Sequence, residues 1–164
     1  MKSKLSKFFV LTVALFLVGA CSKSGAMEVG EVAPDFTIND AEGKPVTLSE
    51  FKGKVIILDF FASWCPPCRM EIPDFIALQK TYASQGFTMV GVSLVDKNET
   101  AKFVSQQNIN YPVAVDDGKA SDSYGPIRSI PTTFLIDKDF KIAKVFIGYR
   151  AKDVFEKEIQ ELLK

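Results

Sequence analysis

Val55-Ile-Ile-Leu-Asp-Phe-Phe61 is an apolar run with one carboxyl group inside it, and Cys65-Pro-Pro-Cys68 follows shortly after. The run predicts a buried central strand. A helical pattern follows over about 66–84, and a proline is tolerated in the first turn of a helix. Two cysteines three residues apart at a helix start can close a disulfide across one turn. The stretch therefore predicts a dithiol that opens and closes in a two-electron reaction.

Short strands and helices alternate along the rest of the chain. A hairpin is expected from strands at 35–38 and 45–48. Further strands are expected at 88–94, 111–115, 132–136 and 141–148, and helices at 97–107, 119–124 and 152–163. We expect Asp96 to cap the helix that follows it and Pro73 to kink the first helix. The alternation predicts one α/β domain with helices on both faces of the sheet.

Composition excludes several classes of function. Apolar residues make up 47% of the chain, which is enough for a real core. Lys plus Arg and Asp plus Glu are both 20, so no basic surplus indicates nucleic acid. Histidine is absent, which excludes Ser-His and Cys-His hydrolases and removes the commonest metal ligand. The sequence predicts neither a cofactor nor a metal site.

Residues 1–20 are expected to be a signal peptide rather than part of the fold. Three lysines precede an apolar stretch at 8–20, which is short for a membrane span. That stretch ends in Leu17-Val-Gly-Ala-Cys21, which resembles a bacterial lipobox with a lipidated cysteine. An uncleaved anchor helix and an ordinary signal peptide are the alternatives.

The mature protein would begin at Cys21. Residues 21–28 would form the lipidated N-terminus and its tether, and residues 29–164 the folded domain. Such a lipoprotein would face the periplasm or the cell exterior, where disulfides persist. The sequence does not distinguish the inner membrane from the outer one, and no oligomer interface is legible, so a monomer is expected.

The two cysteines have different expected roles. Cys65 would lie at the helix N-terminus, where the helix dipole lowers the pKa of a thiol below about 8.5. It would be the exposed, attacking thiol, and Cys68 would be the less accessible resolving thiol. Between them, Pro66 and Pro67 remove two backbone donors from the helix end.

Phe60-Phe-Ala-Ser-Trp-Cys-Pro-Pro-Cys68 resembles the active-site stretch of the thioredoxin superfamily. Arg69-Met-Glu-Ile-Pro73 and Ile130-Pro-Thr-Thr-Phe-Leu-Ile-Asp137 narrow the resemblance to exported TlpA/ResA-like thiol-disulfide oxidoreductases, over residues 29–163. The resemblance implies a thioredoxin-like fold with a central mixed sheet and an N-terminal hairpin extension. It also implies that Pro131 is cis, faces the disulfide and, with Ile130, pairs with a partner segment. The alternative is an ordinary proline at the start of a strand.

Two carboxyl groups match positions that handle protons in such proteins. Asp59 matches the buried aspartate of thioredoxins, and Glu71 a glutamate typical of the ResA-like branch. Burial in an apolar strand would raise the pKa of Asp59, and the resemblance places Glu71 near the dithiol as well. The alternatives are a strand residue bonded to backbone and a solvated helix residue. We expect Trp64, Pro66 and Pro67 to belong to the docking surface, although Trp64 could simply pack.

The expected function is an exported thiol-disulfide oxidoreductase that reduces disulfides in partner proteins. The resemblance implies electrons from a membrane thiol donor and apocytochrome c as the substrate class. A peroxiredoxin-type peroxidase shares the fold but has Thr or Ser three residues before its reactive cysteine, where this chain has Ala62. A metal chaperone would lack a histidine ligand, and two thiolates make a poor closed site. One departure from the family is Phe140, at a turn position where Gly is frequent.

Overall fold

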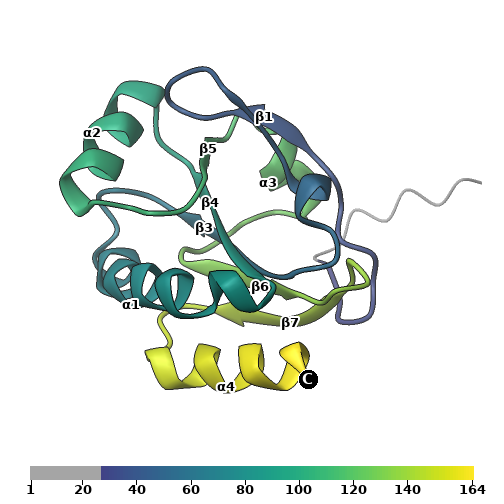
Figure 1. Cartoon of the computed structure of the whole chain (residues 1–164). Coiled ribbons are helices and arrows are strands. Elements are labelled where there is room, and N and C mark those ends of the chain that lie inside the picture. The colour runs from purple at the N-terminus through teal and green to yellow at the C-terminus, as the bar shows by residue number, and fades with distance from the viewer. Residues whose placement is uncertain (1–26) are drawn as a thin grey trace, which may run out of the picture.

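The computed structural model describes residues 27–164, built on a mixed five-stranded sheet (Figure 1). The strand order is β5-β4-β3-β6-β7, with β3 (Val55–Phe61) in the centre and all of its residues buried. On one side β3 pairs parallel with β4 (Phe87–Ser93), and β4 pairs parallel with β5 (Val113–Val115). On the other side β3 pairs antiparallel with β6 (Thr132–Ile136), and β6 pairs antiparallel with β7 (Ile142–Ile147). The predicted buried central strand and mixed sheet are confirmed.

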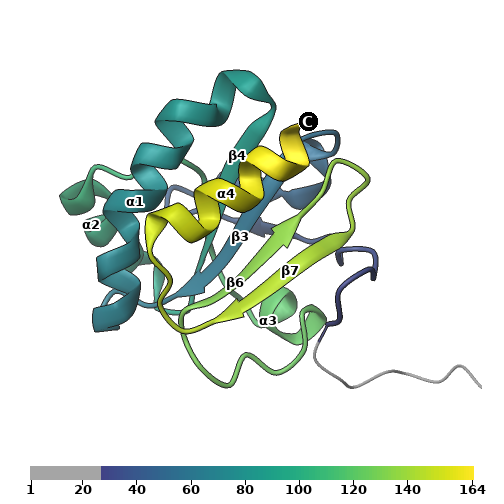
Figure 2. The ribbon, with the colours of Figure 1, turned by 90° about the horizontal axis from the view of Figure 1, so that it is seen from below.

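Helices cover both faces of the sheet, as predicted. Figure 2 shows α1 (Pro66–Tyr82) and α4 (Lys152–Leu163) on one face and the short α3 (Lys119–Ser123) on the other. Between β4 and β5 runs α2 (Lys97–Gln107), which Asp96 caps by accepting N–H bonds from its first turn. The α1 helix runs on through Pro73 and ends in a 3-10 turn, η2 (Ala83–Gln85).

The predicted N-terminal hairpin is also present. It consists of β1 (Thr37–Asn39) and β2 (Pro45–Thr47), which pair antiparallel and lead into η1 (Leu48–Phe51). A bridge between Asp40 and Ala114 joins the hairpin to β5 and so covers part of that edge strand. The predicted leader and Cys21 lie outside the described residues. Within residues 27–164, no helix is long and apolar enough to cross a membrane.

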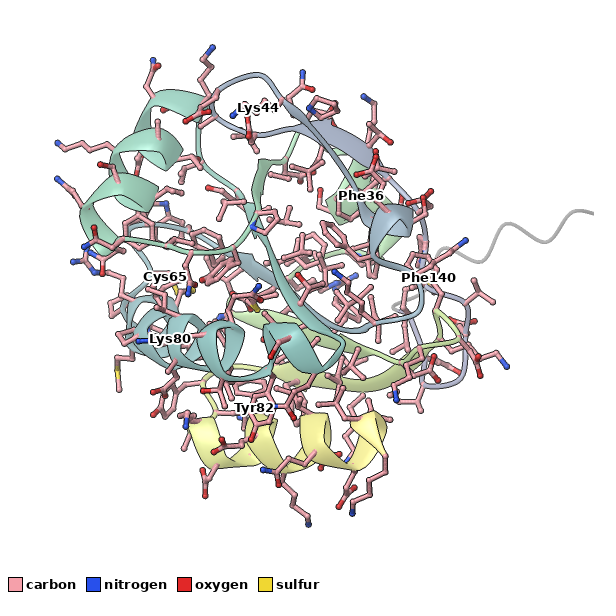
Figure 3. All side chains as sticks on the ribbon, in the orientation of Figure 1. Phe36, Lys44, Cys65, Lys80, Tyr82 and Phe140 are labelled. Atoms are coloured by element: carbon pink, nitrogen blue, oxygen red, sulfur yellow. A yellow bond between two sulfur atoms is a disulfide. The ribbon has the colours of Figure 1, made fainter. Side chains whose placement is uncertain are left out.

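The sheet separates the core into two layers, and side chains fill both (Figure 3). The dithiol layer lies between the sheet and α1 and α4, and it contains Cys65 and Cys68. The hairpin layer lies between the sheet and the N-terminal segment, and its aromatic members include Phe60 and Tyr124. Because side chains alternate along a strand, Asp59 faces the dithiol layer while Leu58 and Phe60 face the hairpin layer.

Two details differ from the sequence expectation or extend it. The strand that we expected to begin at Tyr111 begins only at Val113, because Pro112 has no N–H to donate to a neighbouring strand. The Pro112 carbonyl still accepts a hydrogen bond from the N–H of Gly91 in β4. Phe140 has φ 64°, a left-handed conformation that costs a non-glycine residue about 1–2 kcal/mol. Its ring is buried with the Lys52 ammonium 4.7 Å from the ring centroid, and this burial offsets the cost.

Candidate active site

Cys65 and Cys68 form a disulfide where β3 leads into α1. Cys65 is the N-cap of α1, and Pro66 and Pro67 occupy its first two positions. The two Cα atoms are 5.3 Å apart and the two sulfurs are bonded. The predicted pairing across one turn is therefore confirmed, with both sulfurs held at the end of a buried strand and the start of a helix.

The prolines leave the helix end with few hydrogen-bond donors. Neither Pro66 nor Pro67 has an N–H, so Cys68 supplies the first one, and it points at the Cys65 sulfur over 3.3 Å. This donor and the helix dipole both favour negative charge on Cys65 Sγ once the disulfide is opened. Of the two sulfurs, Cys65 Sγ is therefore the one whose surroundings stabilise a thiolate.

The exposure of Cys65 differs from the expectation. In the oxidised protein Cys65 is 3% exposed and Cys68 is 1% exposed, so the predicted open sulfur is wrong for this state. The reason is that the Cys65 sulfur faces Cys68 on one side and the Ile130 carbonyl oxygen, 3.8 Å away, on another. Trp64, directly before it, is 67% exposed. The disulfide therefore lies just beneath the surface.

The peptide bond between Ile130 and Pro131 is cis, as the resemblance implies. This segment precedes β6 and brings the Ile130 carbonyl to the disulfide. The Pro131 carbonyl accepts the N–H of Gly148 at the end of β7. The backbone opposite the disulfide is thus fixed by β6 and β7 together.

Asp59 is 1% exposed and points from the middle of β3 into the dithiol layer. Its Oδ1 accepts a hydrogen bond of 2.8 Å from the Thr133 hydroxyl, which lies directly across the β3–β6 pairing. The pKa of Asp59 is raised to about 8: burial is the largest cause, the negative charge of Glu71 adds to it, and the hydrogen bond from Thr133 opposes both. The expectation of a raised pKa is confirmed.

Glu71 is fully buried, which excludes the alternative of a solvated helix residue. It lies three residues after Cys68 and therefore on the same side of α1. Its Oε1 accepts the backbone N–H of Arg150 at 2.7 Å. Burial raises the pKa of Glu71 to about 7, while the N–H and the charge of Arg150 oppose that rise.

Asp59 and Glu71 act electrostatically as a pair, because the negative charge of Glu71 raises the pKa of Asp59. Near neutral pH the pair therefore holds protons that isolated carboxyl groups would have lost. The structure brings these two carboxyl groups and Cys68 into one buried layer.

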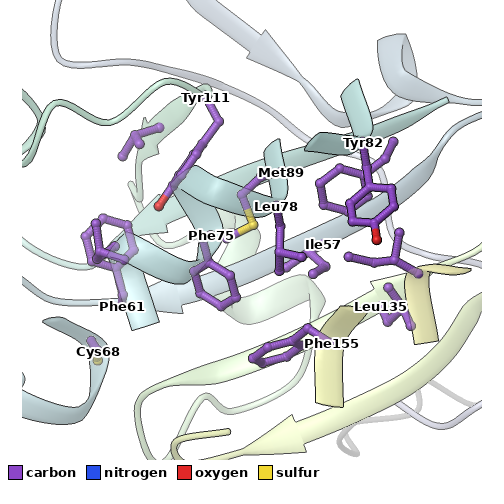
Figure 4. Packing of buried hydrophobic residues seen from close by; sticks show 14 of the residues in the cluster. Ile57, Phe61, Cys68, Phe75, Leu78, Tyr82, Met89, Tyr111, Leu135 and Phe155 are labelled. Carbon is purple, nitrogen blue, oxygen red and sulfur yellow. The ribbon is translucent and has the colours of Figure 1, made fainter. Parts of the chain in front are cut away.

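Sequence reasoning missed three contributors. Thr133 and the Arg150 backbone hold the two carboxylates, and Tyr111 lies buried in the same layer (Figure 4). Thr133 belongs to the Ile-Pro-Thr-Thr motif and could have been found there, since its strand alternation matches that of Asp59. A backbone N–H carries no sequence signal, and neither does a tyrosine before a proline.

Comparison with known proteins agrees with this geometry. Residues 29–145 match the AhpC/TSA family. The chain belongs to this family. Thiol-disulfide oxidoreductase ResA of Bacillus cereus is 36% identical over 146 residues, which cover 88% of this chain and 84% of the relative.

Solved structures place this member of the AhpC/TSA family among thioredoxin-like proteins. A thiol:disulfide interchange protein of the thioredoxin family from Chlorobium tepidum superposes with a TM-score of 0.78 at 36% identity, covering 85% of this chain and all of that one. A secreted thiol-disulfide isomerase from Corynebacterium glutamicum gives a TM-score of 0.74 at 27% identity, covering 80% and 84%. With its Cys65–Cys68 pair, this family member is a ResA-like thiol-disulfide oxidoreductase.

Proposed function

We propose that the protein reduces disulfides in partner proteins outside the cytoplasm. The observation that supports this most directly is a disulfide held at the N-terminus of α1, opposite the cis Ile130–Pro131 segment and in a core layer that also buries two carboxyl groups. Each part of that arrangement has a use in thiol-disulfide exchange, and all three come from different elements of the fold.

The reaction would begin with the reduced protein. The Cys65 thiolate attacks one sulfur of the partner's disulfide, forms a mixed disulfide and releases the partner's other sulfur as a thiolate. Cys68 then passes its S–H proton to the Asp59–Glu71 pair and attacks Cys65 Sγ. The second partner sulfur leaves as a thiolate and takes up a proton. The partner gains two electrons, and the protein is left with the disulfide seen here.

Docking would use the surface around the disulfide. Trp64 is exposed beside Cys65, and Pro66 and Pro67 form the first turn of α1. Ile130 and Pro131 offer backbone opposite the sulfur, against which an extended partner segment can lie. The proposed partner carries a Cys-x-x-Cys-His stretch, as apocytochrome c does, and a membrane thiol protein would restore the dithiol.

Export and anchoring complete the proposal. Residues 1–20 would direct secretion and Cys21 would carry lipid, so the domain at 29–164 works at a membrane surface in an oxidising compartment. Cys21→Ala should move the protein from the membrane fraction to the soluble fraction of cells. Equal membrane association of the wild type and Cys21→Ala would contradict the proposed lipid anchor.

Partner trapping tests the mechanism. Cys68→Ser should accumulate mixed disulfides between Cys65 and natural partners in cells, because the resolving thiol is gone. Cys65→Ser is the matched control and should trap none. Equal trapping by both variants would contradict the roles assigned here. A reduction potential near −120 mV, typical of strong oxidants, would overturn the reductant direction.

A further inference from the structure

Tyr111 carries a buried hydroxyl that the mechanism above does not use. The residue is 7% exposed, and its oxygen has no hydrogen-bond partner in the described part of the chain. Among residues 27–164, the other buried side-chain oxygen or nitrogen without a partner is Oε2 of Glu71. Buried polar atoms are nearly always hydrogen-bonded, so two such atoms in one core layer call for a common explanation.

The backbone around Gly91 brings the Tyr111 ring to the face of Asp59. Gly91 pairs directly with Asp59 across β3 and β4, so a side chain at either position points to the same face of the sheet. A Cβ at Gly91 would lie 3.0 Å from the Phe61 ring, 3.3 Å from the Val113 side chain and 3.6 Å from the ring edge of Tyr111. The Tyr111 ring is therefore one of three side chains that pack against the Gly91 backbone on this face. Figure 4 shows Tyr111 reaching into the cluster that also contains Phe61 and Cys68.

The charges around this hydroxyl make it a donor. Burial raises the pKa of Tyr111 well above 10, and the charges of Asp59 and Glu71 raise it further. The phenol is therefore protonated at every pH at which the protein works. The other charged groups that act on Glu71 are Asp74 on α1 and Arg150 before α4. A protonated phenol in the same core layer as two carboxyl groups can donate its proton to a water that in turn donates to one of them.

We propose that Tyr111 is a positioning residue for Glu71: its hydroxyl donates through one bridging water to the otherwise unpartnered Oε2. Oε1 of Glu71 already accepts the Arg150 N–H, so this second bond would complete the carboxylate's partners. Both bonds stabilise the ionised form of Glu71. The shared proton of the pair then rests on Asp59, and Glu71 is the carboxylate that remains free to accept a proton.

This assignment rests on the proposed function and divides its proton step between the two acids. When Cys68 attacks Cys65, the S–H proton of Cys68 passes to the Asp59–Glu71 pair, whose single negative charge is on Glu71. The pair then holds two protons and releases one to solvent after the partner has left. Tyr111 keeps Glu71 ionised at neutral pH, so the pair can still accept the proton from Cys68.

Tyr111→Phe removes the donor and keeps the ring. An infrared titration of the carboxyl C=O bands in the oxidised protein should show the more acidic midpoint of the pair rising by about one pH unit, since a carboxylate loses a hydrogen bond. In single-turnover reduction of glutathione disulfide, the pH–rate midpoint should rise by the same amount. Below that midpoint the variant should be about tenfold slower, and at high pH the two rates should converge.

Tyr124→Phe is the matched control, because Tyr124 is also buried but donates to the Pro34 carbonyl in the hairpin layer. It should leave both midpoints unchanged. In a Glu71→Gln background, Tyr111→Phe should no longer move the remaining carboxyl midpoint. Superimposable titrations of wild type and Tyr111→Phe, or the same shift in Tyr124→Phe, would overturn the assignment. Absence of disulfide reduction by the wild type would sink the proposed function instead, because the infrared result does not depend on activity.

Discussion

The two core layers on either side of the sheet follow different rules. In the hairpin layer the buried Tyr124 hydroxyl has its partner, the Pro34 carbonyl, and aromatic rings fill the space around it. In the dithiol layer two carboxyl groups are buried with raised pKa values, and Glu71 Oε2 and the Tyr111 hydroxyl have no partner among the described residues. A satisfied apolar layer adds stability. A layer that buries ionisable groups gives up stability for reactivity.

The largest expected effect lies in the hairpin layer. Leu48→Ala empties a fully buried site at the end of the N-terminal hairpin and should lower the free energy of unfolding by about 3 kcal/mol. Urea denaturation at pH 7 measures this. Val29→Ala, at a site 65% exposed, is the control and should change stability by less than about 0.5 kcal/mol. The folded Leu48→Ala protein should reduce disulfides at the wild-type rate. A large loss of rate would contradict the conclusion that the hairpin layer contributes to stability and not to activity.

Asp59→Asn tests the dithiol layer, where we expect a large loss of rate and little loss of stability. The amide keeps the shape and can still accept from Thr133, but it cannot carry the shared proton. Disulfide exchange at pH 7 should slow about a hundredfold, while the protein stays folded. The measurement is the single-turnover rate from pH 5 to pH 9. Unchanged pH–rate behaviour would remove Asp59 from proton transfer and leave it with a structural role alone.

The pH dependence of stability should carry the signature of the same layer. Asp59 and Glu71 titrate near 8 and 7 in the folded protein but near 3.8 and 4.5 when unfolded, so folding takes up protons between these values. The free energy of unfolding should therefore fall as pH rises from about 5 to 8, by up to ~1.4 kcal/mol per pH unit for each proton taken up.

Urea denaturation of wild type and Asp59→Asn across that range isolates the contribution of Asp59. The variant should have the shallower slope, because an amide takes up no proton on folding. Parallel slopes for the two proteins would mean that the Asp59 carboxyl is ionised in the folded state.

The smallest expected effect is that of removing one hydroxyl from the hairpin layer. Tyr124→Phe deletes a satisfied hydroxyl in the hairpin layer and should cost about 1 kcal/mol of stability, since the Pro34 carbonyl loses its donor. The rate of disulfide exchange should not change at any pH. A shift in the pH–rate profile of this variant would show that the sheet does not insulate the two layers electrically.

Much of the site was open to prediction because it depends on neighbours in the chain. The apolar run of β3, the prolines after Cys65 and the cap at Asp96 each act within a few residues, and each was found where the sequence indicated. The cis bond at Pro131 followed only from the resemblance. The burial of Cys65 in the disulfide was not expected from the sequence, because it depends on Ile130, 65 residues further along the chain.

The sequence by itself determined that a buried strand would deliver a cysteine pair to a helix start, with a carboxyl group on each of those two elements. Strand alternation and helical spacing are short-range rules, and they suffice for that. Only the tertiary structure decided which groups hold those carboxyls: Thr133 lies 74 residues from Asp59, and the Arg150 N–H lies 79 residues from Glu71. It also decided their pKa values, because burial in a low-dielectric layer is a property of the packed elements together and of no single segment.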